Sequence, residues 1–175
     1  MQLSELGTRI CILGPSNSGK STLAAAIAQK RGMNLVHLDQ LHHLPNTDWQ
    51  PRPADEFKAL HDAAIAGEQW VMEGNYSSCM PQRFLRATGL ILLDVSVLLS
   101  LFRYTRRTLF EPVRIGALEG CKDRFKWEII HYIAVVTPMN RRRYAEIYRQ
   151  SDLPKVCFLS RRAIRDCYEE WGLER

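Results

Sequence analysis

One short segment has the residue types and the spacing to hold a phosphate group. Residues 14–21 read GPSNSGKS, which fits the pattern G-x-x-x-x-G-K-[S/T] and lies between the apolar run RICIL and a segment of good helix formers. Glycines let successive backbone N–H groups converge on phosphate oxygens, and a helix N-terminus adds partial positive charge. The pattern in this setting favours a triphosphate-binding loop over a chance glycine turn.

The side chains of this loop predict how ATP and Mg²⁺ would be bound. Lys20 would place a full positive charge on the β- and γ-phosphates. The Ser21 hydroxyl is the predicted Mg²⁺ ligand, because magnesium keeps several waters and needs few protein ligands. Thr22 is expected to support the phosphate site. The predicted nucleotide-binding residues are Gly14, Pro15, Ser16, Asn17, Ser18, Gly19, Lys20, Ser21 and Thr22.

The sequence lacks the second motif that is typical of two other classes of protein with such a loop. A guanine-specific GTPase would show N-K-x-D late in the chain, and an ATP-driven motor usually has an apolar strand ending in Asp-Glu. The run ILLDV ends in Asp94-Val95 and WVMEG contains the lone Glu73. Acidic residues at strand ends and scattered arginines instead suit phosphoryl transfer, which depends on electrostatic stabilisation. This favours a small kinase.

Two strand ends supply candidates for the acceptor side. Asp39 would end the second strand, where open α/β sheets bind ligands, and could accept a proton from an acceptor hydroxyl or orient hydrated Mg²⁺. Capping of the next segment is the alternative. Glu73 could hold metal-bound water and Gly74 allows close backbone approach, although a plain strand-to-turn exit explains both. Asp94 is interpreted as a carboxylate that hydrogen-bonds nearby backbone, outside the site.

The elements that must position these residues alternate between strand and helix. Hydrophobic patterning predicts strands at 9–13, 34–39, 69–74, 89–95 and 155–159, and helices at 20–32, 53–67, 80–87, 96–110, 126–136, 138–150 and 161–172. Alternation of this kind implies right-handed crossovers and a parallel sheet covered on both faces. The predicted fold is three-layer α/β, in one domain over 1–175, with an irregular segment after the fourth strand that suits a flap.

Composition excludes several other classes of protein. The 175 residues are 46% hydrophobic and 25% charged, which is typical of a folded globular chain. The five cysteines form no C-x-x-C pair, and the N-terminus lacks a basic start and a long apolar core, so reduced thiols and a cytoplasmic location are expected. No run reaches the ~18 apolar residues of a membrane span.

The net charge of +5 comes largely from RYTRR, NRRRY and SRRAIR. Such clusters attract small phosphates or nucleic acid, although solvated helix faces are the commoner explanation. A regulator or ATPase associated with DNA is therefore the alternative function, without a nucleic-acid motif to support it. A nucleotide-sensing switch that transfers no phosphate is a third possibility. The acceptor and the oligomeric state are not determined by the sequence.

Several motifs together resemble a known family. The segments GPSNSGKST, VHLDQL, EGNYSSCMPQRF, EGCKDRFKWE and LSRRAI, with the stretch 103–107, are similar to the nucleoside and nucleotide kinases related to adenylate kinase, and most closely to the DNA topology modulation (FlaR-like) proteins. The resemblance implies a P-loop NTPase fold with a five-stranded parallel sheet of order 2-3-1-4-5 and a helical lid at roughly 108–125. It also implies that Arg83 contacts the acceptor and that Arg103 and Arg107 neutralise the transferring phosphoryl group.

Other polar residues have simpler explanations. Arg114 is a weaker lid candidate, and Arg106 and residues 141–143 are interpreted as helix-surface ion pairs. His37, His42 and His43 flank Asp39 but fit no common zinc spacing. The loop HHLPNTDWQPRP could wall a planar acceptor with Trp49, or could be a surface turn with Trp49 tucked into the core.

Overall fold

The computed structural model describes residues 1–96, 100–102, 104–106, 116, 118 and 137–174. Five strands form one parallel sheet in the order β2-β3-β1-β4-β5. They are β1 (Arg9–Leu13), β2 (Asn34–His37), β3 (Trp70–Glu73), β4 (Gly89–Leu93) and β5 (Lys155–Phe158). The predicted strand order is confirmed, and β2 ends two residues earlier than predicted.

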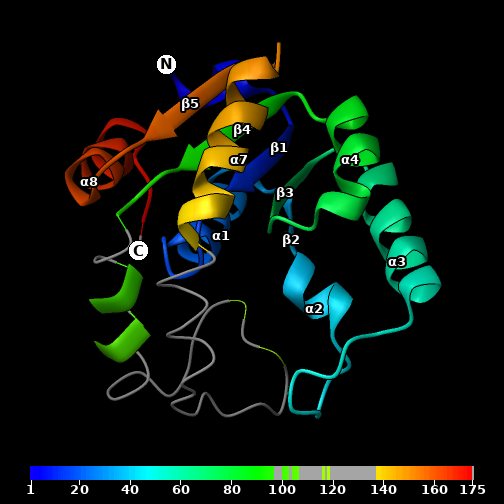
Figure 1. Cartoon of the computed structure of the whole chain (residues 1–175). Helices are drawn as coiled ribbons and strands as arrows, with labels where there is room; N and C mark the ends of the chain where they lie inside the picture. Colours follow the sequence, from blue (N-terminus) through cyan, green and yellow to red (C-terminus); the bar gives the residue numbers. More distant parts are fainter. Residues whose placement is uncertain (97–99, 103, 107–115, 117, 119–136, 175) are drawn as a thin grey trace.

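Helices follow the strands in alternation, as the patterning predicted (Figure 1). They are α1 (Lys20–Arg31), α2 (Leu38–His42), α3 (Ala54–Ala66), α4 (Met80–Arg86), α7 (Thr137–Gln150) and α8 (Arg161–Glu170), with short 3-10 turns η1 (Leu3–Leu6) and η2 (Ser77–Cys79). Residues 100–102 and 104–106 are also helical, which agrees with the helix predicted at 96–110. The predicted helix at 126–136 lies outside the described residues.

Two hydrophobic layers enclose the sheet. In β1, Ile10 and Ile12 face the layer built by α1 and α8, while Cys11 and Leu13 face the layer built with α3, α4 and α7. The alternation of two apolar sets along one strand explains why the strand reads as a continuous apolar run. Both faces are therefore covered, and polar chemistry is left to the sheet edges.

Local signals set the ends of the helices. α1 ends at Gly32, which has φ +62° and donates its N–H to the Ala28 carbonyl, a left-handed ending that glycine adopts without steric cost. α8 begins after Ser160, whose hydroxyl accepts the Ala163 N–H at 3.1 Å. These ends confirm the boundaries that Gly32 and the SRRAI segment predicted.

The carboxyl ends of the strands meet at one edge. In the parallel register His37 and Ile12 both pair with Glu73, and Leu13 pairs with Leu92. In Figure 1 this edge faces downward, with α2 directly after β2. Loops at the carboxyl edge are where open α/β sheets bind ligands.

Candidate active site

The glycine loop lies at the carboxyl edge, between the end of β1 and the start of α1. Gly14 has φ +147°, and a Cβ atom there would lie 2.4 Å from the Leu93 carbonyl oxygen. Gly19 caps α1 in the left-handed region with φ +101°. Both glycines are therefore required by backbone geometry, and the first amides of α1, which have no partner within the helix, open toward the loop.

Two polar side chains hold the loop in place: that of Lys20, which begins α1, and that of Asn75, which follows β3. Lys20 Nζ donates to the Pro15 carbonyl at 2.9 Å, which holds its charge across the loop. Asn75 brackets Gly14: its Oδ1 accepts the Gly14 N–H at 3.2 Å, and its Nδ2 donates to the Gly14 carbonyl at 2.9 Å. Thr22, predicted to support the phosphates, is exposed in the first turn of α1. The loop is thus anchored to the segment that follows β3.

Ser21, Glu73 and His37 form a hydrogen-bonded cluster next to the loop. Glu73 Oε1 accepts the Ser21 hydroxyl at 3.0 Å and lies 2.9 Å from His37 Nδ1. Both Glu73 and His37 are buried. Burial raises the pKa of Glu73, but the His37 hydrogen bond, the charges of Lys20 and His37 and the Ser21 hydrogen bond outweigh it and lower the pKa overall. Glu73 is therefore a stable carboxylate at neutral pH.

This cluster fits the requirements of Mg²⁺. Magnesium prefers oxygen ligands, keeps several waters and usually takes one or two protein groups beside substrate phosphates. The Ser21 hydroxyl and the Glu73 carboxylate supply neighbouring oxygens from two elements, α1 and β3, at the start of the phosphate loop. Among the described residues no group of three or more His, Cys, Asp or Glu side chains is arranged to hold a metal ion.

Asp39 lies in the first turn of α2, directly after β2, rather than at the end of β2 as predicted. The strand ends early because α2 begins at Leu38, which is fully buried and packs against Gly74, where a Cβ would lie 2.8 Å from Leu38 Cβ. The Asp39 carboxylate accepts the Tyr76 hydroxyl at 2.6 Å, and the Asp39 backbone carbonyl accepts the His43 N–H at 3.1 Å. The half-buried carboxylate is thus held next to the site.

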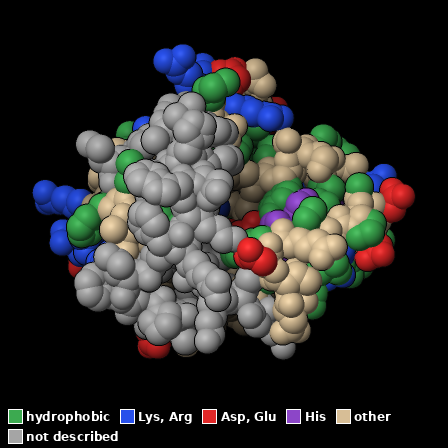
Figure 2. Space-filling model, turned by 60° about the horizontal axis from the view of Figure 1, so that its bottom comes forward, with side chains coloured by type: hydrophobic (Ala, Val, Ile, Leu, Met, Phe, Trp, Pro, Cys, Tyr) green, Lys and Arg blue, Asp and Glu red, His purple; other side chains and the backbone are tan. Residues whose placement is uncertain are grey.

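Aromatic rings, including that of Tyr76, pack on one another in the segments next to Asp39. The His42 ring lies 4.7 Å from that of Tyr76 and 4.9 Å from that of Phe57, and the His43 ring lies 5.1 Å from that of Trp49. Burial and the neighbouring His43 lower the pKa of His42, against the opposing effect of Asp39. Figure 2 shows histidine side chains among hydrophobic ones on this face of the molecule. Trp49 is half-buried and has φ +61°.

Arg83, expected to contact the acceptor, is fully buried on α4. Its three guanidinium nitrogens have no hydrogen-bond partner within the described part of the chain. Burial lowers its pKa, against the opposing effects of Cys11, Cys79 and Glu73. The structure therefore places Arg83 inside the layer between α4 and the sheet, and its role toward an acceptor stays a prediction.

The predicted lid is described only in part. Arg103, Arg107 and Arg114 lie outside the described residues, so their predicted roles are not addressed by the structure. Gly116 has φ +75° and lies against His37, since a Cβ there would be 2.9 Å from His37 Nδ1. Arg141 on α7 donates to the Asp94 carboxylate at 2.5 Å, which agrees with the ion-pair interpretation of this arginine and gives Asp94 a side-chain partner instead of the expected backbone one.

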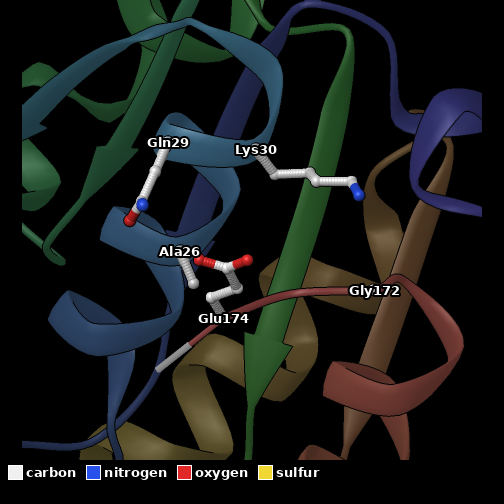
Figure 3. Close-up of a pocket in the computed structure, with 5 residues that line it drawn as sticks. All are labelled: Ala26, Gln29, Lys30, Gly172 and Glu174. Atoms are coloured by element: carbon white, nitrogen blue, oxygen red, sulfur yellow. The ribbon is translucent and has the colours of Figure 1, made fainter.

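A cavity of about 190 Å³ lies away from this site, between α1 and the C-terminal segment (Figure 3). Ala26, Gln29, Lys30, Gly172 and Glu174 line it, and Lys30 extends toward Gly172. Lys30 follows Lys20 by three turns of helix, or roughly 15 Å along the axis. The cavity is therefore separate from the phosphate loop.

Sequence reasoning missed three residues that the structure brings to the site. His37 contacts Glu73, Asn75 brackets Gly14 and Tyr76 binds Asp39. The available signal was position: all three lie at or just after strand ends on the carboxyl edge. Their polar side chains in VHLDQL and EGNY could have been assigned to the same edge as Glu73.

Comparisons with known proteins establish the fold. No protein-family model matches the sequence, and no curated protein matches it significantly. The structure is similar to a gluconokinase from Sinorhizobium meliloti 1021, with a TM-score of 0.57 and 16% identity over 96% of this chain and 93% of that one. It is also similar to a shikimate kinase from Acinetobacter baumannii in complex with shikimate, with a TM-score of 0.58 and 13% identity over 94% of this chain and 91% of that one. The chain thus has the α/β fold of P-loop kinases, as predicted.

The structure also bears on membrane association. Among the residues that it describes, no helix has both the length and the apolar character needed to cross a bilayer.

Proposed function

We propose that the chain is a Mg²⁺-dependent kinase that transfers the γ-phosphoryl group of ATP to a hydroxyl group of a small molecule. The observation that carries this proposal is the segment 73–76, which contacts both halves of the site. Glu73 binds Ser21 on the side of the phosphate loop, and Tyr76 binds Asp39 on the other side. The kinase fold of the two structural neighbours supports the same reaction class.

The roles follow from the positions of the groups. Lys20 and the loop amides would bind the β- and γ-phosphates, and Ser21 with Glu73 would hold Mg²⁺, which would supply neutralising charge. The acceptor oxygen forms a bond to the γ-phosphorus while the bond to the β–γ bridging oxygen breaks, and ADP leaves. Asp39 accepts the proton that the acceptor hydroxyl loses. On the family resemblance, and not on a position in the structure, Arg103 and Arg107 are proposed to neutralise charge on the transferring group.

The narrower resemblance leads to a further proposal about kinship. The segments EGNYS and EGCKDRFKWE support a relationship to the FlaR-like proteins within the nucleoside and nucleotide kinase group. The acceptor panel should therefore contain nucleosides and nucleoside monophosphates. It should also contain gluconate and shikimate, because the two structural neighbours are kinases named for these compounds.

The test is ADP formation from Mg-ATP by the purified protein, with and without each acceptor. Lys20→Ala should abolish the acceptor-stimulated rate while the chain still unfolds cooperatively in urea, because it removes the phosphate-binding charge from a half-exposed position. Lys30→Ala is the matched control, since Lys30 is an exposed lysine at the other end of the same helix. An equal rate in Lys20→Ala and wild type would refute the site. Uniformly flat rates with measurable ATP binding would favour the regulator or the switch.

A further inference from the structure

The contact between Tyr76 and Asp39 joins the two segments that follow neighbouring strands. Asp39 follows β2 and Tyr76 follows β3, and the two strands end in register, with His37 paired to Glu73. The Tyr76 hydroxyl donates to Asp39 Oδ1 at 2.6 Å, a short hydrogen bond typical of a carboxylate acceptor. One oxygen of the proposed base is therefore already bonded to the protein.

The Tyr76 ring is itself held in place by packing. The ring of His42 lies 4.7 Å away at a tilt of 34°, and the ring of Phe57 lies 5.2 Å away. Phe57 is buried on α3, so the packing connects Tyr76 to the hydrophobic layer of the domain. A ring fixed by packing holds its hydroxyl in one orientation, so no further rotational entropy is lost at the moment of reaction.

The segment that carries Tyr76 also sets the donor side of the site. Three of its four residues contact a different functional group: Glu73 binds Ser21, Asn75 brackets Gly14 and Tyr76 binds Asp39. The four residues thus connect the metal-binding hydroxyl, the phosphate loop and the proposed base through one short piece of backbone. The orientation of Asp39 is thereby tied to the position of the phosphate loop.

We propose that Tyr76 is a positioning residue, which binds Asp39 Oδ1 and so presents Oδ2 to the acceptor hydroxyl. This inference rests on the proposed function. During transfer the proton of the acceptor hydroxyl moves to Oδ2, the acceptor oxygen bonds to the γ-phosphorus, and ADP leaves with the electron pair of the broken bond. Tyr76 keeps its own proton throughout, because it acts only through Asp39.

The test combines Tyr76→Phe with Asp39→Ala. Phenylalanine keeps the ring that packs on His42 and Phe57 and removes only the hydroxyl. Loss of a hydrogen bond to a charged group predicts a roughly 10- to 100-fold fall in the kcat of acceptor-stimulated ADP formation, with the KM for ATP within about twofold of wild type. In the Asp39→Ala background, where no carboxylate remains to be positioned, Tyr76→Phe should cause no further loss.

Tyr148→Phe is the matched control, since Tyr148 lies on α7 and its ring contacts Lys155. Lys155 is the first residue of β5, the edge strand at the far end of the sheet from β2. Tyr148→Phe should leave both kinetic constants and the urea midpoint unchanged. A wild-type kcat in Tyr76→Phe, or losses that multiply in the double variant, would overturn the positioning role while the kinase proposal stands. A wild-type protein with no acceptor-stimulated ADP formation from any acceptor would refute the proposed function itself, and this role with it.

Discussion

Replacement of Glu73 by glutamine tests the charge at the centre of the site. The side chain is buried at the end of β3, and its Oε1 both accepts the Ser21 hydroxyl and hydrogen-bonds His37 Nδ1. Glutamine has nearly the same shape and keeps a carbonyl oxygen, but it removes the negative charge that the two partners and Lys20 stabilise. The change therefore isolates the electrostatic contribution of the cluster.

The size of the effect follows from the two hydrogen bonds. A hydrogen bond to a charged group contributes about 1.5–3 kcal/mol, against about 1 kcal/mol for a neutral pair. The difference is about 0.5–2 kcal/mol per bond, so neutralising the shared acceptor of two bonds should cost about 1–4 kcal/mol, and relief of the desolvation that opposes the charge moves the expected cost toward the lower end of that range. Urea unfolding at pH 7 measures the difference. Glu68→Gln is the control, because its side chain is 80% exposed and its ion pairs with Arg9 and Arg86 contribute little.

The stabilisation by Glu73 should depend on pH in a definite direction. Because the folded-state pKa of Glu73 lies below its ordinary value of 4.5, the stabilisation is complete above about pH 5 and is lost as the pH falls through 4.5 toward the folded-state value. The gap between wild type and Glu73→Gln should therefore be constant from about pH 7 to pH 5 and shrink below that. Equal stability at pH 7, or a gap that widens in acid, would refute the reasoning.

Two further predictions concern backbone space and thiol burial. Gly14→Ala should destabilise the chain by about 1–3 kcal/mol and weaken ATP binding measured by calorimetry, because its methyl group would strike the Leu93 carbonyl. Gly32→Ala has open space and should cost only about 1 kcal/mol, for the left-handed backbone, without affecting ATP binding; equal binding losses would contradict this account. Burial raises the pKa of Cys11 to about 11 and that of Cys167 to about 12, so at pH 8 both should exist as unreactive thiols. An aromatic disulfide reagent should label these two thiols slowly until urea unfolds the chain. Fast labelling of Cys11 or Cys167 in the folded protein would contradict their burial.

The parts of the site that could be predicted are those encoded in adjacent residues. The glycine pattern from Gly14 to Ser21 has local meaning, because a strand, a turn and a helix N-terminus are enough to form a phosphate loop. The order of strands was predicted from the family resemblance and is confirmed. The end of β2 was predicted two residues late, because α2 begins at Leu38, whose packing against Gly74 in the segment after β3 is not revealed by hydrophobic patterning.

The residues that could not be predicted are those whose partners lie on other elements. His37 and Glu73 are 36 positions apart, and Tyr76 and Asp39 are 37 apart, so neither pair leaves a local spacing pattern. Arg83 shows the same limit in the opposite direction. The family resemblance implies an acceptor contact, which stays a prediction, and the complete burial of its guanidinium between α4 and the sheet could not be predicted from the sequence.

The sequence by itself determined the alternation of strands and helices and the glycine pattern of the loop, because each depends on residues within one turn or one strand of each other. The tertiary structure decided which polar groups meet. Parallel pairing brings the ends of β2 and β3 into register, so that Glu73 reaches Ser21 while Tyr76 reaches Asp39. Register and burial arise from the whole sheet, and for this reason the connection between the two halves of the site appears only in the folded chain.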